Sequence, residues 1–269
     1  MNNGKDFRKL FFFLFLFFAA ALSQAQTVGK TITAAADVVN VEITVSGIDV
    51  VIAASEEAVI SYKYELTAGS ELSVVTRDNA LRFINFRPSS GTLFIYIPKD
   101  FLLNSCRIQA LNSNIRVHGI KSIYFAVSGT SNNSEITASM FKNVLIVASF
   151  GSITFNSRII AVADFCFSSA KGAISIGENK EDCNIFITQS KNKKFIFDGM
   201  AYEKNTLTST PQKPKKFITV SASFSELEIG FVEPSIEPVE KFDAYGISEF
   251  GPKPPPRLEN ELSNFLPKN

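Results

Sequence analysis

The chain has 269 residues, of which 27 are Lys or Arg and 26 are Asp or Glu, so its formal net charge at pH 7 is +1. This balance excludes the strong basic field through which proteins neutralise the phosphates of nucleic acid, so we expect no nucleic-acid partner. An apolar share of 45% is enough to build a core, and three cysteines are too few for a disulfide-rich secreted scaffold.

Residues 1–25 have the three parts of a secretory signal peptide. Three basic residues precede an uninterrupted apolar run at 10–22, and Ser23 and Ala25 occupy the −3 and −1 positions of a cleavage site. The apolar run spans only about 20 Å as a helix, less than the roughly 30 Å core of a bilayer. We therefore expect export to the periplasm or the cell surface, with an uncleaved anchor as the alternative. No later segment has 18 consecutive apolar residues, so we expect no membrane span after cleavage.

Residues 26–232 are expected to form one all-β domain. Short runs of β-branched and aromatic residues alternate with polar ones and are broken by Gly, Asn and Ser, as in 41–45 and 93–97. From 108 onward an apolar–x–apolar triplet recurs, with first residues 21, 17, 21, 21 and 32 apart, and an insertion around 201–215 explains the last gap. The triplets are Ile115-Arg116-Val117, Ile136-Thr137-Ala138, Ile153-Thr154-Phe155, Ile174-Ser175-Ile176, Phe195-Ile196-Phe197 and Leu227-Glu228-Ile229.

A second set of apolar residues repeats every 20 positions, at Phe125, Leu145, Phe165 and Ile185. A fixed period of this length is typical of repeat proteins whose units stack and cover one another's apolar faces. The sequence therefore predicts a single-stranded parallel β-helix, or β-solenoid, with rungs of about 20 residues stacked about 4.8 Å apart. An antiparallel β-sandwich is the alternative.

Two kinds of segment in this region resemble a known family. The strand Leu93-Phe94-Ile95-Tyr96-Ile97 ends in Pro98-Lys99-Asp100, and later turns such as Ser149-Phe150-Gly151-Ser152 and Ala170-Lys171-Gly172 precede apolar strands. These segments are similar to the bacterial putative-adhesin family known as DUF4097, over about 38–232. Asn and Ser stand where that family often has Ser-Gly-Asp turns. The resemblance implies a surface adhesin and carries over no residue of established function.

Residues 233–269 are different in composition. They include Pro252 and the run Pro254-Pro255-Pro256, with seven acidic and four basic residues. Proline cannot join a central strand and favours extended conformers, so we expect a flexible Pro-rich tail. Docking of this tail to a partner through its aromatic residues is the alternative.

The sequence offers no recognisable catalytic or metal-binding motif. His118 is the single histidine and precedes Gly119, which predicts a turn residue rather than a ligand or general base. The acidic residues expected on the repeats are scattered rather than paired, which disfavours glycoside hydrolysis. They are Glu135, Asp164, Glu226 and Glu228. We expect no cofactor, no metal and no enzymatic activity.

Two lysine clusters form the candidate ligand patch: Lys191, Lys193 and Lys194, with Lys213, Lys215 and Lys216. If the insertion at 201–215 folds back, the two clusters would form one surface for acidic glycans or lipid head groups. Exposed lysines that oppose edge-to-edge aggregation are the alternative.

The repeat also places the cysteines. It puts Cys106 and Cys183 in one column, about four rungs or roughly 19 Å apart, beyond the reach of a disulfide. Cys166 lies between Phe165 and Phe167 and so faces the opposite side. We expect no intramolecular disulfide.

These observations together predict a non-catalytic, exported cell-envelope protein that resembles adhesins and binds a glycan or another envelope protein. A periplasmic scaffold that docks a partner through its tail is one alternative, and a glycan-processing β-helix enzyme is another.

Overall fold

The computed structural model describes residues 27–28, 31–191, 193–211 and 214–232. The predicted signal peptide and Pro-rich tail lie outside these residues. The described part of the chain is all-β, with twenty strands in one mixed sheet and a single 3₁₀ turn, Lys180–Asp182. It contains no helix long and apolar enough to cross a membrane.

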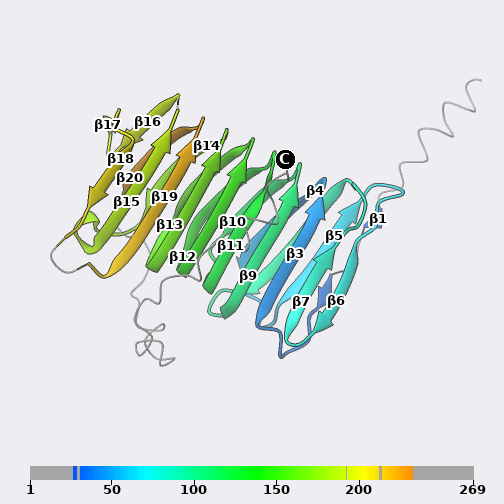
Figure 1. Cartoon of the computed structure of the whole chain (residues 1–269). Helices are drawn as coiled ribbons and strands as arrows, with labels where there is room; N and C mark the ends of the chain where they lie inside the picture. The colour runs from blue at the N-terminus through cyan, green and yellow to red at the C-terminus, as the bar shows by residue number, and fades with distance from the viewer. Residues whose placement is uncertain (1–26, 29–30, 192, 212–213, 233–269) are drawn as a thin grey trace, which may run out of the picture. The chain divides into compact units, whose positions relative to one another are not determined.

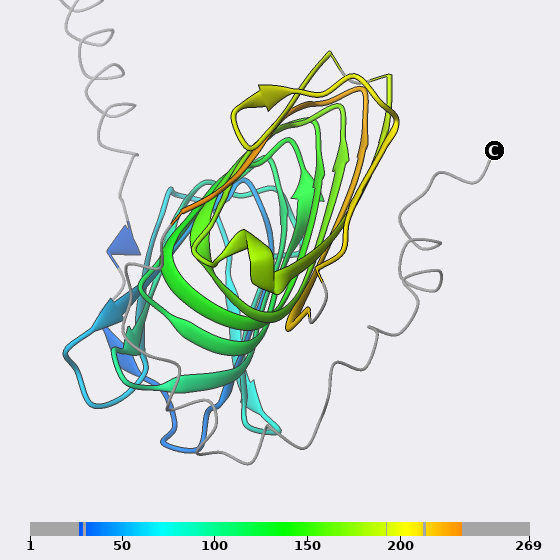
Figure 2. The ribbon, with the colours of Figure 1, turned by 90° about the vertical axis from the view of Figure 1, so that its left-hand side faces the viewer.

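The sheet folds into two facing layers, here called face A and face B, with the core between them (Figures 1 and 2). Along most strands buried and outward residues alternate, as the pleat of a β-strand requires. A face-A strand followed by a face-B strand is here called a coil. The chain passes from face A to face B at one edge of the stack, the A-to-B edge, and returns at the B-to-A edge.

Face A consists, in spatial order, of β6 (Ser73–Arg77), β7 (Ala80–Ile84), β3 (Asn40–Ser46), β9 (Leu102–Leu111), β11 (Lys121–Thr130), the second halves of β12 (Asn133–Ser149) and β13 (Ser152–Ser168), β19 (Lys216–Ser223), β15 (Cys183–Ser190) and β18 (Thr206–Ser209).

Face B consists of β1 (Thr27–Val28) and β2 (Ile32–Thr33), both paired with β5 (Ser61–Leu66), then β8 (Gly91–Pro98), β4 (Ile48–Ser55), β10 (Asn114–His118), the first halves of β12 and β13, β14 (Lys171–Ile176), β20 (Glu226–Phe231), β16 (Lys194–Phe197) and β17 (Met200–Ala201).

The central coils pair in parallel with an offset of 19 residues. Leu102 pairs with Lys121, Asn114 with Asn133 and Ser152 with Lys171. The predicted spacing of 20 residues is therefore one residue too long between β11 and β12. Phe125 stands beside Val144 rather than Leu145, and Leu145 points outward because strand neighbours alternate in direction.

Most apolar residues of the triplets lie on the inner face, but the spacing between triplets does not predict which residues of neighbouring strands pair. Ile115 lies beside Ser134, and Ile136 lies beside Val117. The third residue of one triplet, Ala138, is exposed and has a left-handed backbone with φ of 51°. The irregular spacing of the triplets therefore reflects which inner positions happen to be apolar.

Both ends of the stack have an unexpected strand order. Near the N-terminus, the coil of β3 and β4 lies between the coil of β7 and β8 and the coil of β9 and β10. Near the C-terminus, the coil of β19 and β20 lies between the strands β13 and β14 and the coil of β15 and β16. At each end, strands run antiparallel to their neighbours and cover the outermost coil: β5 and β6 at one end, β17 and β18 at the other.

A single-stranded parallel β-helix is therefore not confirmed. Each coil contributes a strand to two faces, the terminal strands are antiparallel, and the order in space differs from the order in the sequence. The predicted insertion at 201–215 contains β18, one of the antiparallel end strands. Its first residue, Ala201, is also the last residue of β17. The outermost strands β1, β2 and β17 have two residues each, and very short edge strands are a known way to limit edge-to-edge pairing.

A buried ion triad holds the inserted C-terminal coil in place. Nε of Arg158, in β13, lies 3.0 Å from Oε1 of Glu178, which follows β14, and Nζ of Lys216, the first residue of β19, binds Oε2 of the same carboxylate. All three side chains are nearly buried. The carboxylate thus links the inserted strand β19 to β13 and to the segment that follows β14.

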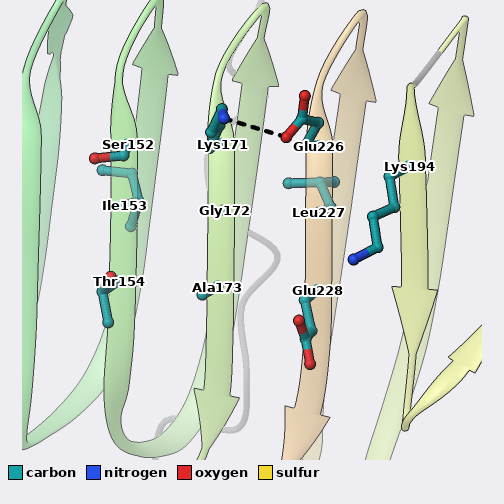
Figure 3. A pocket seen from close by; sticks show the side chains of 10 residues that line it. All are labelled: Ser152, Ile153, Thr154, Lys171, Gly172, Ala173, Lys194, Glu226, Leu227 and Glu228. Carbon is teal, nitrogen blue, oxygen red and sulfur yellow. Dashed lines mark ion pairs between the residues drawn. The ribbon is translucent and has the colours of Figure 1, made fainter.

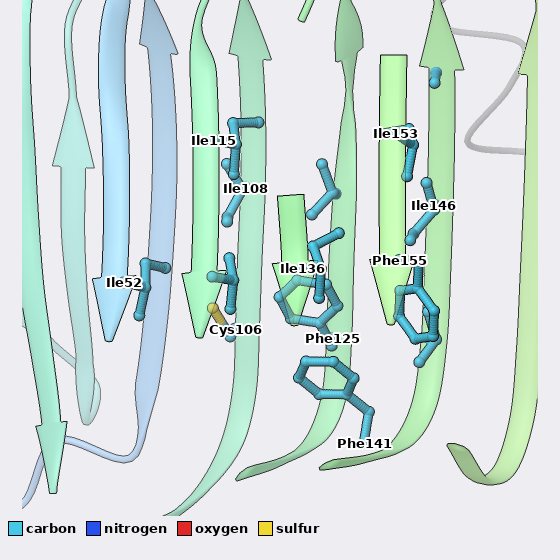
Figure 4. Close-up of a cluster of buried hydrophobic side chains, with 14 of the residues drawn as sticks. Ile52, Cys106, Ile108, Ile115, Phe125, Ile136, Phe141, Ile146, Ile153 and Phe155 are labelled. Carbon is cyan, nitrogen blue, oxygen red and sulfur yellow. The ribbon is translucent and has the colours of Figure 1, made fainter. Parts of the chain in front are cut away.

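The core is filled by aliphatic columns and a run of aromatic rings (Figure 4). Phe125 stacks on Phe141 with ring centres 4.2 Å apart, and Phe155 packs edge-on against Phe165 at 5.4 Å. These rings are supplied by the central coils and by the bend of β12 between the two faces.

All three cysteines are free thiols, as expected. Their placement differs from the prediction, because Cys106 lies in the column of Ile185, and Cys183 lies two residues earlier along β15. Burial raises the pKa of Cys106 to about 12 and those of Cys166 and Cys183 to about 11.

Candidate binding surface on face B

The outer side of face B carries a ladder of hydrogen-bonded polar side chains across its central coils. The backbone N–H of Asn114 donates to Oδ1 of Asp49 at 2.8 Å, and Nδ2 of Asn133 donates to Oδ1 of Asn114 at 3.4 Å. The hydroxyl of Ser152 donates to Oδ1 of Asn133 at 2.8 Å. The 19-residue offset places Asn114, Asn133 and Ser152 directly beside one another, and the pairing of β10 with β4 adds Asp49 to the row.

The ladder continues as charged residues on the last coils. Lys171, on β14, follows Ser152 and forms an ion pair of 3.3 Å with Glu226 on β20. Lys194, on β16, is the next residue in the row, beside Glu226. The row therefore alternates in charge where the inserted coil meets its neighbours.

A shallow hollow of about 230 Å³ lies in this part of face B (Figure 3). Its floor includes Ala173, whose small side chain stands between Thr154 and Glu228 in the next outward row. The residues that line the hollow are Ser152, Ile153, Thr154, Lys171, Gly172, Ala173, Lys194, Glu226, Leu227 and Glu228.

Gly172 lies beneath the hollow and lets two apolar side chains approach the backbone. A Cβ atom added there would lie 2.7 Å from Cδ2 of Leu227 and 3.0 Å from Cζ of Phe167. Since an alanine at this position would displace these side chains, the glycine keeps β14 close to the core. At the centre of the hollow, the outward side chain of β14 is only the methyl group of Ala173.

The hollow offers both donors and acceptors of hydrogen bonds. Lys171 and Lys194 supply ammonium donors, Glu226 and Glu228 supply carboxylate acceptors, and the hydroxyl of Thr154 can do both. Because the surface is open to water, ligand hydroxyl groups can replace water at these groups with little loss of hydrogen bonding. The arrangement suits a ligand rich in hydroxyl groups.

The predicted lysine patch is divided between the two edges of the stack. Lys191 and Lys193 are exposed at the A-to-B edge, and Lys194 lines the hollow. Lys215 and Lys216 lie at the B-to-A edge, about 25 Å away along the eight residues of β15. The clusters therefore do not form one surface.

The lysines at the B-to-A edge also have partners of their own. Lys215 pairs with Asp182 at 3.0 Å, and Lys216 belongs to the buried triad. Lys213 lies outside the described residues.

His118 is the last residue of β10, exposed, with Nδ1 3.0 Å from the hydroxyl of Thr137. Glu135 lies beside Arg116 on face B, and Asp164 lies on the outer side of face A. Burial raises the pKa of Asp164, and a hydrogen bond with Thr219 opposes this rise. Within the described residues, no three His, Cys, Asp or Glu side chains are grouped as a metal site would require.

Sequence reasoning missed the hollow, although it named Glu226 and Glu228. In the sequence these residues lie more than 50 positions beyond Lys171, and a sequential stack would put β15 and β16 next to β13 and β14. The insertion of β20 between β14 and β16 brings the carboxylates and the lysines together. No local pattern in the sequence signals this order.

No family model and no curated protein matches this chain. Among solved structures, it is similar to a putative cell adhesion protein from Clostridium sporogenes, with a TM-score of 0.46 and 9% identity over 76% of this chain and 99% of that one. It is also similar to a putative adhesin from Bacteroides fragilis, with a TM-score of 0.45 and 10% identity over 76% and 96% of the two chains. A third similar structure is a putative adhesin from Parabacteroides distasonis, with a TM-score of 0.41 and 12% identity over 76% of this chain and 95% of that one.

Proposed function

We propose that the protein is a non-catalytic, adhesin-like surface protein that binds a glycan through the outer side of face B. The observation that carries the proposal is the shallow hollow over Ala173, which two lysines and two glutamates line together. A ring of hydroxyl groups can bridge such alternating donors and acceptors, and the open surface admits one unit of a longer chain.

The character of the carboxylates supports binding rather than glycoside cleavage. A general acid in glycosidases is a carboxyl group held in an apolar pocket. Glu226 is instead paired with Lys171, and Glu228 is exposed on a strand surface. We therefore propose no catalytic role for either residue.

The proposal includes two finer points on architecture and family. We class the coils with their 19-residue offset as a β-solenoid with non-sequential ends, and we place the chain as a distant relative of the DUF4097-type family. Export, on which a surface role depends, is predicted from residues 1–25. We propose a polar glycan as the ligand, with another envelope protein as the alternative partner.

The test is a glycan array probed with the full-length chain and with Ala173→Gln. Glutamine is tolerated on the outer side of a strand, but here it fills the hollow, so we expect the signal on bound glycans to fall at least tenfold. Ala126→Gln, on the outer side of face A, is the matched control and should bind as the wild type does. Equal binding by all three proteins, or no bound glycan at all, would refute the proposed site.

A further inference from the structure

The turns at the A-to-B edge form a column of seven left-handed residues, one on each of seven coils. Each of the first six donates its backbone N–H to the carbonyl of the residue that precedes the corresponding turn on the next coil. In spatial order the residues are Gly47, Asn112, Ser131, Phe150, Ser169, Phe224 and Lys191, with φ between 50° and 75°. Glycine and asparagine are the residues that best tolerate this backbone.

Phenylalanine is unusual at two of these positions. Phe150 and Phe224 combine left-handed φ values of 50° and 53° with side chains that are 61% and 52% exposed. The turn does not require an aromatic ring, because serine occupies the same position in the turns on either side of Phe150. The core does not require one either, because both rings are exposed. The two rings are two coils apart, or about 9.6 Å, and Ser169 between them leaves both projecting from the edge.

Positive charge lies directly beside the Phe224 ring. Nζ of Lys191, on the next coil, is 5.4 Å from the centre of the Phe224 ring, and Lys193 is exposed two residues later. No described residue forms an ion pair with either lysine within 4.0 Å. Phe150, Phe224, Lys191 and Lys193 are here called the aromatic ridge.

We infer that the aromatic ridge docks the protein onto an anionic phospholipid surface. Projecting phenylalanine rings enter the boundary between head groups and acyl chains, while neighbouring lysines bind the acidic head groups. A soluble acidic polymer would use the lysines but has no apolar layer for the rings. This inference goes beyond the proposed function and rests on different residues, at the edge of the stack rather than in the hollow.

Sedimentation with vesicles tests the inference. We expect the full-length chain to sediment with vesicles of phosphatidylcholine containing one third phosphatidylglycerol, and much less with phosphatidylcholine alone. Binding should weaken when the salt concentration is raised to about 0.5 M, because the electrostatic part is screened.

Residues of the same column supply the variants. Phe150→Ser and Phe224→Ser copy the turns at Ser131 and Ser169, so the fold should persist, and each should weaken binding about tenfold. Lys191→Asn copies the turn at Asn112 and should weaken binding about fivefold. Any contribution of the N-terminal segment is common to all these proteins.

Two controls remove the same side chains from elsewhere. Phe186→Ser, on the outer side of face A, and Lys99→Asn, at the B-to-A edge, should bind vesicles as the wild type does. Ala173→Gln should also bind, which separates this test from that of the hollow.

Three results would overturn the inference. They are absence of binding to the anionic vesicles, equal binding by the double variant Phe150→Ser/Phe224→Ser, and binding to soluble polygalacturonate in preference to vesicles. The last result would assign the lysines to an acidic glycan.

Discussion

Ser134 is a polar residue in an otherwise apolar inner column of face B. It lies between Ile115 and Ile153, its side chain is buried, and its hydroxyl oxygen has no hydrogen-bond partner among the described residues. A buried hydroxyl group that lost its water without gaining a partner destabilises the folded state. The sequence triplets did not reveal this position, because they follow apolar residues alone.

We therefore expect Ser134→Ala to raise the free energy of unfolding by about 1 kcal/mol. Urea denaturation measures the change. Ser139→Ala is the matched control, since the Ser139 hydroxyl donates to the Thr137 carbonyl at 2.9 Å and accepts from the Ile120 N–H at 3.3 Å. The free energy of unfolding of Ser139→Ala should fall by about 1 kcal/mol. Destabilisation of similar size in both variants would show that the Ser134 hydroxyl is satisfied.

Asp164 makes the stability of the folded protein depend on pH. Burial raises its pKa above the ordinary value of 3.8, so the folded state binds the proton more tightly than the unfolded state does. Stability from this group is present below pH 3.8 and is lost as the pH rises through the folded-state pKa.

Asp164→Asn should therefore stabilise the protein at pH 7, where it removes a partly buried negative charge and keeps an oxygen for Thr219. At pH 3 the gain should disappear, because the carboxyl group is then protonated in both states. Urea denaturation at the two pH values gives the comparison. A gain of the same size at both would mean that charge is not the cause.

At the scale of elements, the buried triad decides whether the inserted coil stays in place. Removing the Glu178 charge leaves Arg158 and Lys216 as two neighbouring buried cations without their shared counter-charge. We expect Glu178→Gln to cost about 3 kcal/mol of stability. Glu56→Gln breaks an exposed pair with Lys99 and should cost less than about 1 kcal/mol, as exposed pairs usually do.

Thermal and urea denaturation of both variants, followed by circular dichroism, measures this difference. If Glu178→Gln were as mild as Glu56→Gln, the carboxylate would not be what anchors β19 to β13.

The strands themselves were predictable from the sequence, but their order was not. Alternation of apolar and polar residues is a local signal, and it correctly marked the inner residues of β14, β16 and β20. The 20-residue spacing failed at Leu145, because β11 and β12 pair with an offset of 19 residues, which puts Val144 beside Phe125 and turns Leu145 outward. Insertion of the coil of β19 and β20 depends on long-range packing and on Glu178, which leave no periodic trace.

At the scale of the whole molecule, the difference between local sequence signals and long-range strand order explains why the candidate site was not predicted. The balanced charge led us to expect no nucleic-acid partner, and the search of the sequence for catalytic motifs needed no fold. The hollow depends on three strands, β14, β20 and β16, that are neighbours only because the last coil is inserted. The lysine clusters were grouped by sequence distance, whereas the length of β15 separates them.

Surface display is the central claim of the proposed function, and protease shaving of the intact cells that produce the protein tests it most directly. Lys204 is exposed between β17 and β18, so trypsin should cleave after it and release peptides detectable by mass spectrometry. A periplasmic marker protein should stay intact in the same cells. We expect cleavage of this chain without damage to the cells; cleavage only after the outer membrane is opened would contradict a surface role.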